Sequence, residues 1–381
     1  MKDLVRNLAW PVACGLLAAL LIVQKYPHWL GLPETSNVAI QMAPQAAAPS
    51  VGPASYSDAV QRAAPAVASI FTSKELEGET NGQQRGRTLR DYSDTMPAPA
   101  RRQSSLGSAV ILSPDGYLLT NNHVIADADE ILVALQDGRE ALARLIGTDP
   151  ETDLAVLKID LPNLPAVTIS SSDELRQRTG DVVMAIGNPF GLGQTVTMGI
   201  ISATGRNQLG LNTYEDFIQT DAAINQGNSG GALIDAHGNL IGINTAIFSQ
   251  SGGSQGIGFA IPARLAYEVM HEIIAAGRVI RGWLGVEVQP VTPELAASYN
   301  LKQNEGIVIT GLYRDGPAWQ AGLQPGDLIL RIDNQPASSG RDAMNQVARA
   351  DPGETVTMEV LRDGNTHTFV AQVGVRPSFK P

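Results

Sequence analysis

The chain has 381 residues, and its 27 Lys and Arg against 38 Asp and Glu give a formal net charge of −11. This acidic balance argues against nucleic acid as the main partner, because phosphate binding requires clustered Lys and Arg. The single cysteine lies in an apolar N-terminal run, which excludes a disulfide scaffold, thiol catalysis in the soluble part and a Cys-based zinc site. None of the five histidines has ligand spacing such as H-x-x-x-H, so we expect no metal.

An uncharged apolar run occupies residues 8–23, with Lys2 and Arg6 before it. A cleaved signal peptide is one interpretation, but it should end in a small-residue cleavage site. Residues 24–29 are instead bulky or charged. We therefore favour a retained transmembrane helix at residues 8–27, with cleavage as the alternative.

The orientation of this helix determines on which side of the membrane the neighbouring segments lie. The positive-inside rule places residues 1–7 in the cytoplasm and the bulk of the chain on the far side of the membrane. Residues 28–56 are rich in Ala, Pro, Gln and Ser and have little apolar periodicity. We expect them to act as a tether.

Short strands dominate the predicted soluble part. A helix is expected over residues 57–67, then a strand over 67–73 and a mobile polar loop over 74–105. Turn-bounded strands follow at 108–113, 116–122, 131–136, 153–160, 181–187, 195–202, 217–221, 231–235, 239–248 and 256–262. Residues 107–119 also echo residues 230–241. Two six-stranded β-barrels fit this pattern best.

The remaining chain predicts a helix and a second, smaller domain. Apolar residues at helical spacing with a Gly stop predict a helix over residues 262–277, which closes the first domain at 57–278. His271 on this helix has no predicted chemistry. Residues 281–375 then mix short strands and helices within the size of one small domain.

Three motifs carry the predicted chemistry. His123 follows a strand, Asp153 begins another, and Ser229 lies in the glycine-dense loop GNSGG. Serine needs a base within hydrogen-bond reach, commonly His, and that His needs a carboxylate on its other nitrogen. The N–H groups of Gly227 and Ser229 can face a developing oxyanion. Each motif alone has a structural explanation, but the order His, Asp, Ser matches chymotrypsin-like proteases.

The sequence resembles the HtrA (Deg) family of serine proteases over residues 57–374. The matching segments are LTNNHVI, DPETDLAVLKI, GDVVMAIGNPFGLGQTVTMGIISATGR, FIQTDAAINQGNSGGAL and GIGFAIP. The resemblance implies a mainly β protein: a chymotrypsin-like double β-barrel protease domain followed by one PDZ domain, behind the N-terminal transmembrane helix. His123 is then the general base, Asp153 its orienting carboxylate and Ser229 the nucleophile.

The resemblance also implies further site residues. They are the oxyanion hole (Gly227, Asn228, Ser229), the S1 pocket (Ala223, Ile224), a regulatory contact (Phe190, Arg206, Gln219) and a peptide-binding loop and helix (Trp283, Leu284, Gly285, Val286, Met344, Val347). An apolar S1 pocket predicts small aliphatic P1 residues such as Val or Ala. Many family members have Tyr where this chain has Phe190, which removes a hydroxyl from the regulatory contact.

The resemblance implies the function of the family's membrane-anchored stress sensors. Such an enzyme is a homotrimer in the bacterial inner membrane with its catalytic part in the periplasm, and it uses no cofactor. C-terminal peptides of misfolded outer-membrane proteins activate it, and it makes the first cut in a transmembrane anti-sigma factor. The alternatives are a broad quality-control protease, a non-catalytic peptide-binding scaffold and a mitochondrial relative.

Overall fold

The computed structural model describes residues 10, 14, 15, 17, 55–75, 102–169, 177–188, 193–207, 209–247, 254–292, 295–296 and 306–377. No helix among these residues is long and apolar enough to cross a membrane. The helix expected at residues 8–27 lies almost entirely outside them, so it stays a prediction.

A seven-stranded sheet forms the first half of the domain expected at residues 57–278. A short helix, α2 (Ser57–Ala63), and a single 3₁₀ turn, η2 (Ala64–Ala66), precede it. Its elements are β1 (Val67–Glu75), β2 (Arg102–Ile111), β3 (Tyr117–Asn121), α3 (Asn122–Ile125), β4 (Glu130–Ala134), β5 (Glu140–Leu142), β6 (Arg144–Asp149) and β7 (Leu154–Lys158). The strand order is β5-β4-β1-β2-β3-β7-β6. The sequence predicts a six-stranded barrel here but identifies only five of these seven strands, because β5 and β6 have no clear apolar pattern, so the predicted strand number is wrong. Only Ala143 separates these two edge strands, so one bend in the chain brings the sheet edges together.

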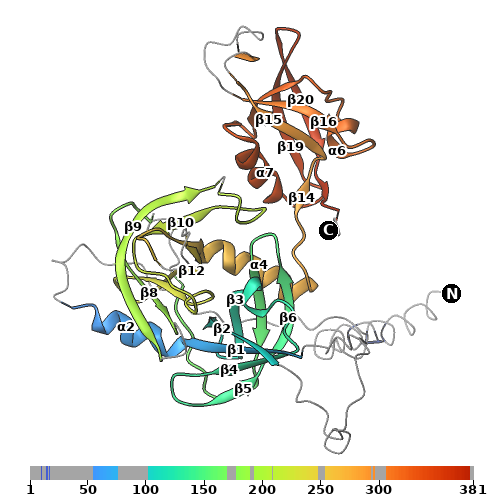
Figure 1. Ribbon diagram of the computed structural model, residues 1–381. Coiled ribbons are helices and arrows are strands. Elements are labelled where there is room, and N and C mark those ends of the chain that lie inside the picture. The colour runs from blue at the N-terminus through green and yellow to red at the C-terminus, as the bar shows by residue number, and fades with distance from the viewer. Residues whose placement is uncertain are drawn as a thin grey trace, which may run out of the picture. The chain divides into compact units, whose positions relative to one another are not determined.

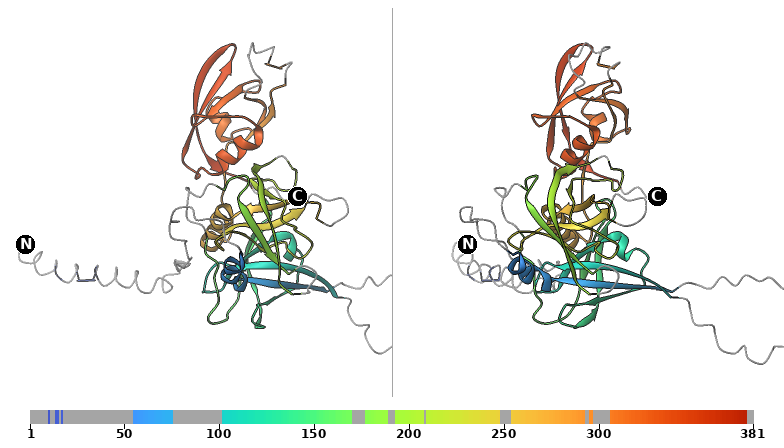
Figure 2. Two further views of the ribbon diagram at one scale, coloured as in Figure 1. Left: turned by 90° about the vertical axis from the view of Figure 1, so that its left-hand side faces the viewer. Right: turned by 60° about the vertical axis from the view of Figure 1, so that its left-hand side comes forward.

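Strands β1 and β2 extend into the loop expected at residues 74–105. Their antiparallel register runs from Val67 opposite Val110 to Glu75 opposite Arg102. Figure 2 shows β1 (blue) and β2 (teal) side by side along this length. Both ends of the expected loop are therefore strand, and the rest of it, residues 76–101, lies outside the described residues.

A closed six-stranded barrel forms the second half, as predicted (Figure 1). Its strands are β8 (Val182–Gly187), β9 (Thr195–Arg206), β10 (Phe217–Thr220), β11 (Ala232–Asp235), β12 (Leu240–Ile247) and β13 (Gly258–Pro262), in the order β10-β13-β12-β11-β8-β9. Fully buried Val, Ile, Leu and Ala side chains fill its interior. The echo between residues 107–119 and 230–241 corresponds to two hairpins, β2–β3 and β11–β12.

One helix joins the two halves. Helix α4 (Ala263–Ala276) contacts β12 and β13 of the barrel and also β6 and β7 of the sheet. It ends at Gly277, whose φ of 74° is the left-handed C-cap conformation that glycine adopts without strain. The Gly277 N–H donates to the Ile273 carbonyl at 2.8 Å. The apolar spacing and the Gly stop therefore predicted this helix to within one residue at each end.

In the described part of the C-terminal module there are a six-stranded antiparallel sheet, a separate two-stranded sheet (β14 and β21) and the short helices α6 and α7. Its elements are β14 (Gly282–Trp283), β15 (Val286–Pro290), β16 (Ile307–Leu312), α6 (Pro317–Gln320), β17 (Leu328–Ile332), β18 (Gln335–Pro336), α7 (Gly340–Ala348), β19 (Thr355–Arg362), β20 (Asn365–Gln372) and β21 (Gly374–Val375). The main sheet has the order β15-β16-β17-β19-β20, and β18 pairs with β17. Leu284, Val347 and the inward residues of β16, β17 and β19 form its core.

Candidate active site

The structure pairs His123 with Asp153. His123 lies in α3, directly after β3, and Asp153 directly precedes β7, the strand that pairs with β3. The Nδ1 atom of His123 is 2.7 Å from Oδ2 of Asp153, and the His123 backbone N–H donates to Oδ1 at 2.9 Å. Asp153 is thus hydrogen-bonded to both the ring and the backbone of the histidine. The His123 side chain itself is half-exposed, so its ring can reach a substrate.

The backbone of Asp153 is fixed in an unusual conformation. Its φ of 60° is left-handed, which Asp tolerates better than most residues. Its carbonyl oxygen accepts hydrogen bonds from the Asn122 N–H (3.1 Å) and the Asn121 side-chain amide (3.0 Å). These bonds stabilise the carboxylate in its position beside His123.

Thr245 on β12 connects Ser229 to Asp153. The Ser229 hydroxyl donates to the Thr245 carbonyl oxygen at 3.0 Å, and the Thr245 hydroxyl donates to Asp153 Oδ2 at 2.9 Å. The three expected residues therefore belong to one hydrogen-bonded group. Because its hydroxyl donates to Thr245, Ser229 must exchange this hydrogen bond for one to His123 before it can give its proton to the histidine. No sequence motif marks Thr245, which lies in a strand whose residues 240–245 are all buried.

A four-residue turn precedes the serine. The Asn228 N–H donates to the Asn225 carbonyl at 3.0 Å, and Gly227, in the third position, has a φ of 97°. A positive φ at that position is the type II pattern, which favours glycine. Among the described residues, the N–H groups of Gly227 and Ser229 have no acceptor. Asn228, expected as a third donor, is not available, because its N–H closes the turn.

The glycine after Ser229 is required by close packing. Gly230 has a φ of 82°, and a Cβ atom there would overlap the Ser108 carbonyl oxygen and the Thr120 hydroxyl. Its N–H donates to the Asn244 carbonyl at 2.8 Å. The glycine-dense loop is therefore packed between β2 and β12.

The two expected S1 residues differ in exposure. Ala223 is partly exposed, and its carbonyl accepts a hydrogen bond from the Thr197 hydroxyl at 2.8 Å. Ile224 is only 1% exposed, belongs to the barrel core and packs against Gly258. Its side chain therefore supports the barrel instead of facing a substrate, and only Ala223 stays a candidate for the pocket base.

Two of the three expected regulatory residues are in contact. Arg206, at the end of β9, donates from Nε to Gln219 Oε1 on β10 at 2.9 Å. The two strands pair in the barrel, with Phe217 opposite Arg206. Phe190 lies outside the described residues.

The loop after Arg206 is organised around a buried carboxylate. Glu215 is 1% exposed and accepts hydrogen bonds from three backbone N–H groups, those of Leu209 (2.8 Å), Leu211 (2.7 Å) and Asn212 (3.2 Å). Burial raises the pKa of Glu215, but these donors outweigh it and hold the pKa below its usual range. The ionised carboxylate thus stabilises the loop conformation.

The C-terminal module contains an apolar cavity of about 300 Å³. All six residues expected to bind a peptide line it: Trp283, Leu284, Gly285, Val286, Met344 and Val347. Gly285 has a φ of 73°, and the rings of Trp283 and Tyr313 pack edge to face beside it, 5.2 Å apart. The cavity therefore lies between the loop that begins β15 and the helix α7.

Comparison with known families divides the chain into the same two domains that the sequence predicts. Residues 107–243 match the model of the trypsin-like peptidase domain, and residues 282–373 match the PDZ domain. The first match contains His123, Asp153 and Ser229. The second contains all six residues that the sequence predicts to bind a peptide.

Curated relatives align over most of the chain. A probable periplasmic serine endoprotease, DegP-like, from Brucella suis biovar 1 is 42% identical over 359 residues, which cover 86% of this chain and 70% of the relative. The serine endoprotease DegS of Escherichia coli K12 is 43% identical over 371 residues, covering 96% of this chain and 97% of DegS.

Solved structures of HtrA-type proteases are also similar to this chain. The HtrA-type protease AlgW with a decapeptide is 64% identical, has a TM-score of 0.73 and corresponds to 85% of this chain and 99% of its own. AlgW with a tripeptide is 65% identical with a TM-score of 0.72, at 85% and 98% coverage.

Proposed function

Because the chain belongs to the HtrA family of serine endoproteases, we propose that it is a peptide-activated protease of the bacterial periplasm. Residues 8–27 anchor it in the inner membrane, residues 57–278 form its protease domain and residues 281–375 form its PDZ domain. C-terminal peptides of misfolded outer-membrane proteins activate it, and it makes the first cut in a transmembrane anti-sigma factor. The near full-length correspondence with DegS supports this assignment.

The proposed chemistry assigns one role to each residue of the His123, Asp153 and Ser229 group. The Ser229 oxygen attacks the scissile carbonyl carbon while its proton moves to Nε2 of His123. Asp153 accepts the Nδ1–H hydrogen bond, which selects the tautomer with a free Nε2 and stabilises the imidazolium. His123 then protonates the leaving amine, and water hydrolyses the acyl-enzyme by the reverse path.

The oxyanion hole consists of two backbone donors in this proposal. The N–H groups of Gly227 and Ser229 lie on either side of Asn228 and have no acceptor among the described residues. Such pre-oriented donors stabilise the tetrahedral oxyanion without reorganisation during the reaction. The type II turn at residues 225–228 is the catalytic form, and rotation of the 226–227 peptide would withdraw one donor.

The PDZ cavity receives the activating signal. A bound peptide would add a strand at the sheet edge, place its terminal carboxylate at the loop of residues 283–286 and insert its last side chain between Met344 and Val347. The AlgW structures hold a tripeptide or a decapeptide, which supports peptide binding as the input. The Arg206–Gln219 contact belongs to the proposed switch, together with Phe190. The proposed enzyme is a homotrimer.

The cavity lined by the six expected residues is the observation that carries this proposal. The experiment is cleavage of the periplasmic domain of an anti-sigma factor by the full chain, with peptides that differ only at their C-terminal residues. We expect one primary cut whose rate depends strongly on those residues. Cleavage of many unfolded proteins without peptide would instead indicate quality control. Peptide binding with no cleavage and no fluorophosphonate adduct at Ser229 would indicate a scaffold.

A further inference from the structure

A fully buried serine on β2 contacts the catalytic loop from behind. Ser108 is 0% exposed. Its N–H donates to the Ser229 carbonyl at 2.8 Å, and its hydroxyl donates to the Gly227 carbonyl at 2.7 Å. The same hydroxyl accepts the Asn188 N–H at 3.0 Å. One residue, 119 positions away from Gly227 in the sequence, thus bonds to both residues that supply the free oxyanion donors.

These contacts fix specific peptide groups of the loop. The Ser108 hydroxyl holds the Gly227 carbonyl, which belongs to the 227–228 peptide. The Ser108 N–H holds the Ser229 carbonyl, which belongs to the 229–230 peptide. Among the described residues, the Gln226 carbonyl has no hydrogen-bond donor. The 226–227 peptide is therefore the one unit of the turn that can rotate while its neighbours stay in place.

Asn188 determines the direction of the Ser108 hydroxyl. A serine hydroxyl rotates freely unless a donor occupies one of its lone pairs. The Asn188 N–H does so, and it leaves the O–H directed at the Gly227 carbonyl. A hydroxyl that accepts one hydrogen bond also donates a stronger one.

Asn188 is itself fixed by two further contacts. Its side-chain oxygen accepts the Gly193 N–H at 2.9 Å, and its amide donates to the Ser69 hydroxyl at 2.6 Å. The chain from Asn188 through Ser108 to Gly227 is therefore a continuous set of hydrogen bonds within the interior.

On the basis of the proposed serine-protease function, we propose that Ser108 is a positioning residue for catalysis. Its hydroxyl holds the Gly227 carbonyl so that the Gly227 and Ser229 N–H groups stay directed at the developing oxyanion. Ser108 touches neither the substrate nor the reacting atoms. Removal of its hydroxyl leaves the Gly227 carbonyl and the Asn188 N–H without partners in the interior, and both groups then shift to find new ones.

The test compares two buried serines. The first variant is Ser108→Ala. The matched control is Ser113→Ala, because Ser113 is also 0% exposed and follows β2, but its hydroxyl donates only to Asp115 (3.1 Å), outside the site. Rates are normalised to titrated active sites, with saturating activating peptide. Ser108→Cys, which keeps a side-chain donor, though a weaker one, is the second variant in case Ser108→Ala does not fold.

We expect Ser108→Ala to lower kcat by about tenfold to a hundredfold with KM within about twofold, below the hundredfold to thousandfold loss of a deleted oxyanion donor. Affinity for a peptide boronate, whose adduct places an oxyanion in the hole, should fall by the same factor. The pH profile should not move, and Ser108→Cys should lie between Ser108→Ala and the parent enzyme. A kcat per titrated site equal to that of Ser113→Ala, or an unchanged boronate affinity, would overturn the proposal.

Discussion

The Thr245 hydroxyl donates a 2.9 Å hydrogen bond to Oδ2 of Asp153, the same oxygen that lies 2.7 Å from His123 Nδ1. This second donor holds Oδ2 of Asp153 in its position beside the histidine ring. Thr245→Val keeps the shape and the main-chain carbonyl but removes the donor. A hydrogen bond to a charged group contributes about 1.5–3 kcal/mol, so kcat/KM should fall about tenfold to a hundredfold. Thr366→Val, on an exposed position of β20, is the control. Equal activity of both variants would rule out this role for Thr245.

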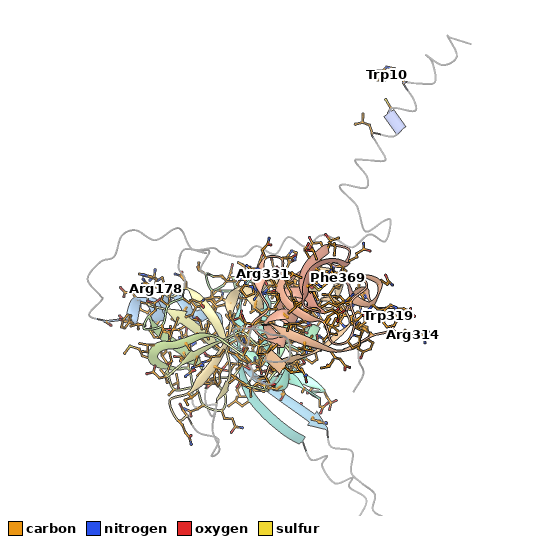
Figure 3. The ribbon with its side chains drawn as sticks, turned by 90° about the horizontal axis from the view of Figure 1, so that it is seen from above. Trp10, Arg178, Arg314, Trp319, Arg331 and Phe369 are labelled. Carbon is orange, nitrogen blue, oxygen red and sulfur yellow. The ribbon has the colours of Figure 1, made fainter. Side chains whose placement is uncertain are left out.

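The Arg206–Gln219 contact predicts a loss of regulation without a loss of fold. Arg206→Ala should retain the parent melting temperature but lose most of its stimulation by peptide, because the 2.9 Å bond between β9 and β10 is gone. Arg178→Ala is a suitable control, since the Arg178 side chain is 79% exposed and points outward (Figure 3). Stimulation that survives Arg206→Ala unchanged would remove Arg206 from the mechanism.

The lowered pKa of Glu215 predicts a pH-dependent stability. Because the folded-state pKa lies below the ordinary value of 4.5, the unfolded state binds more protons, and stability rises with pH. The contribution of Glu215 is thus complete above about pH 6 and is lost as the pH falls through the folded pKa. The melting temperature of Glu215→Gln should be below that of the parent at pH 7, and the gap should narrow below pH 4.5. Exposed Glu140→Gln should show no such gap. A gap that is constant with pH would contradict this assignment.

The S1 assignment predicts a switch in specificity. With Ala223 at the pocket base, the parent enzyme should cleave after small aliphatic residues, since an uncharged pocket cannot compensate a buried Lys or Arg. Ala223→Asp should raise the ratio of cleavage after Lys or Arg to cleavage after Val by at least tenfold. Profiling both enzymes on one peptide library measures this ratio directly. Dominant cleavage after Lys or Arg by the parent enzyme would exclude Ala223 as the pocket base.

The cavity in the C-terminal module predicts a separable binding site. Val347→Asp places a charge in an apolar pocket that should accept the last side chain of the peptide, so peptide affinity should fall at least tenfold. Trp319→Ala should bind as the parent does, because Trp319 is 50% exposed outside the cavity lining. Calorimetric titration with one peptide compares the three proteins. Equal affinities would place the peptide elsewhere.

Periodicity predicted the strands whose inward residues are consistently apolar, such as β7 and β8. It missed β5 and β6, because their side chains are half-exposed and include Glu140 and Arg144. The His123–Asp153 pairing could be predicted because each residue adjoins a recognisable strand. The roles of Thr245 and Ser108 could not be predicted, because their hydrogen-bond partners lie 92 and 119 positions away in the sequence. The prediction that Ile224 lines the pocket is wrong, because its adjacency to Ala223 in the sequence does not show which of the two side chains faces the barrel core.

In the function proposed above, peptide binding in the PDZ domain controls the reactivity of Ser229. The rate constant for labelling of Ser229 by a fluorophosphonate measures this control without any protein substrate. We expect a peptide with a free C-terminal carboxylate to raise that rate constant at least tenfold in the parent enzyme. The same peptide amidated at its C-terminus should have no effect, nor should the free peptide with Val347→Asp. Labelling at one rate under all of these conditions would show that the PDZ domain does not control Ser229.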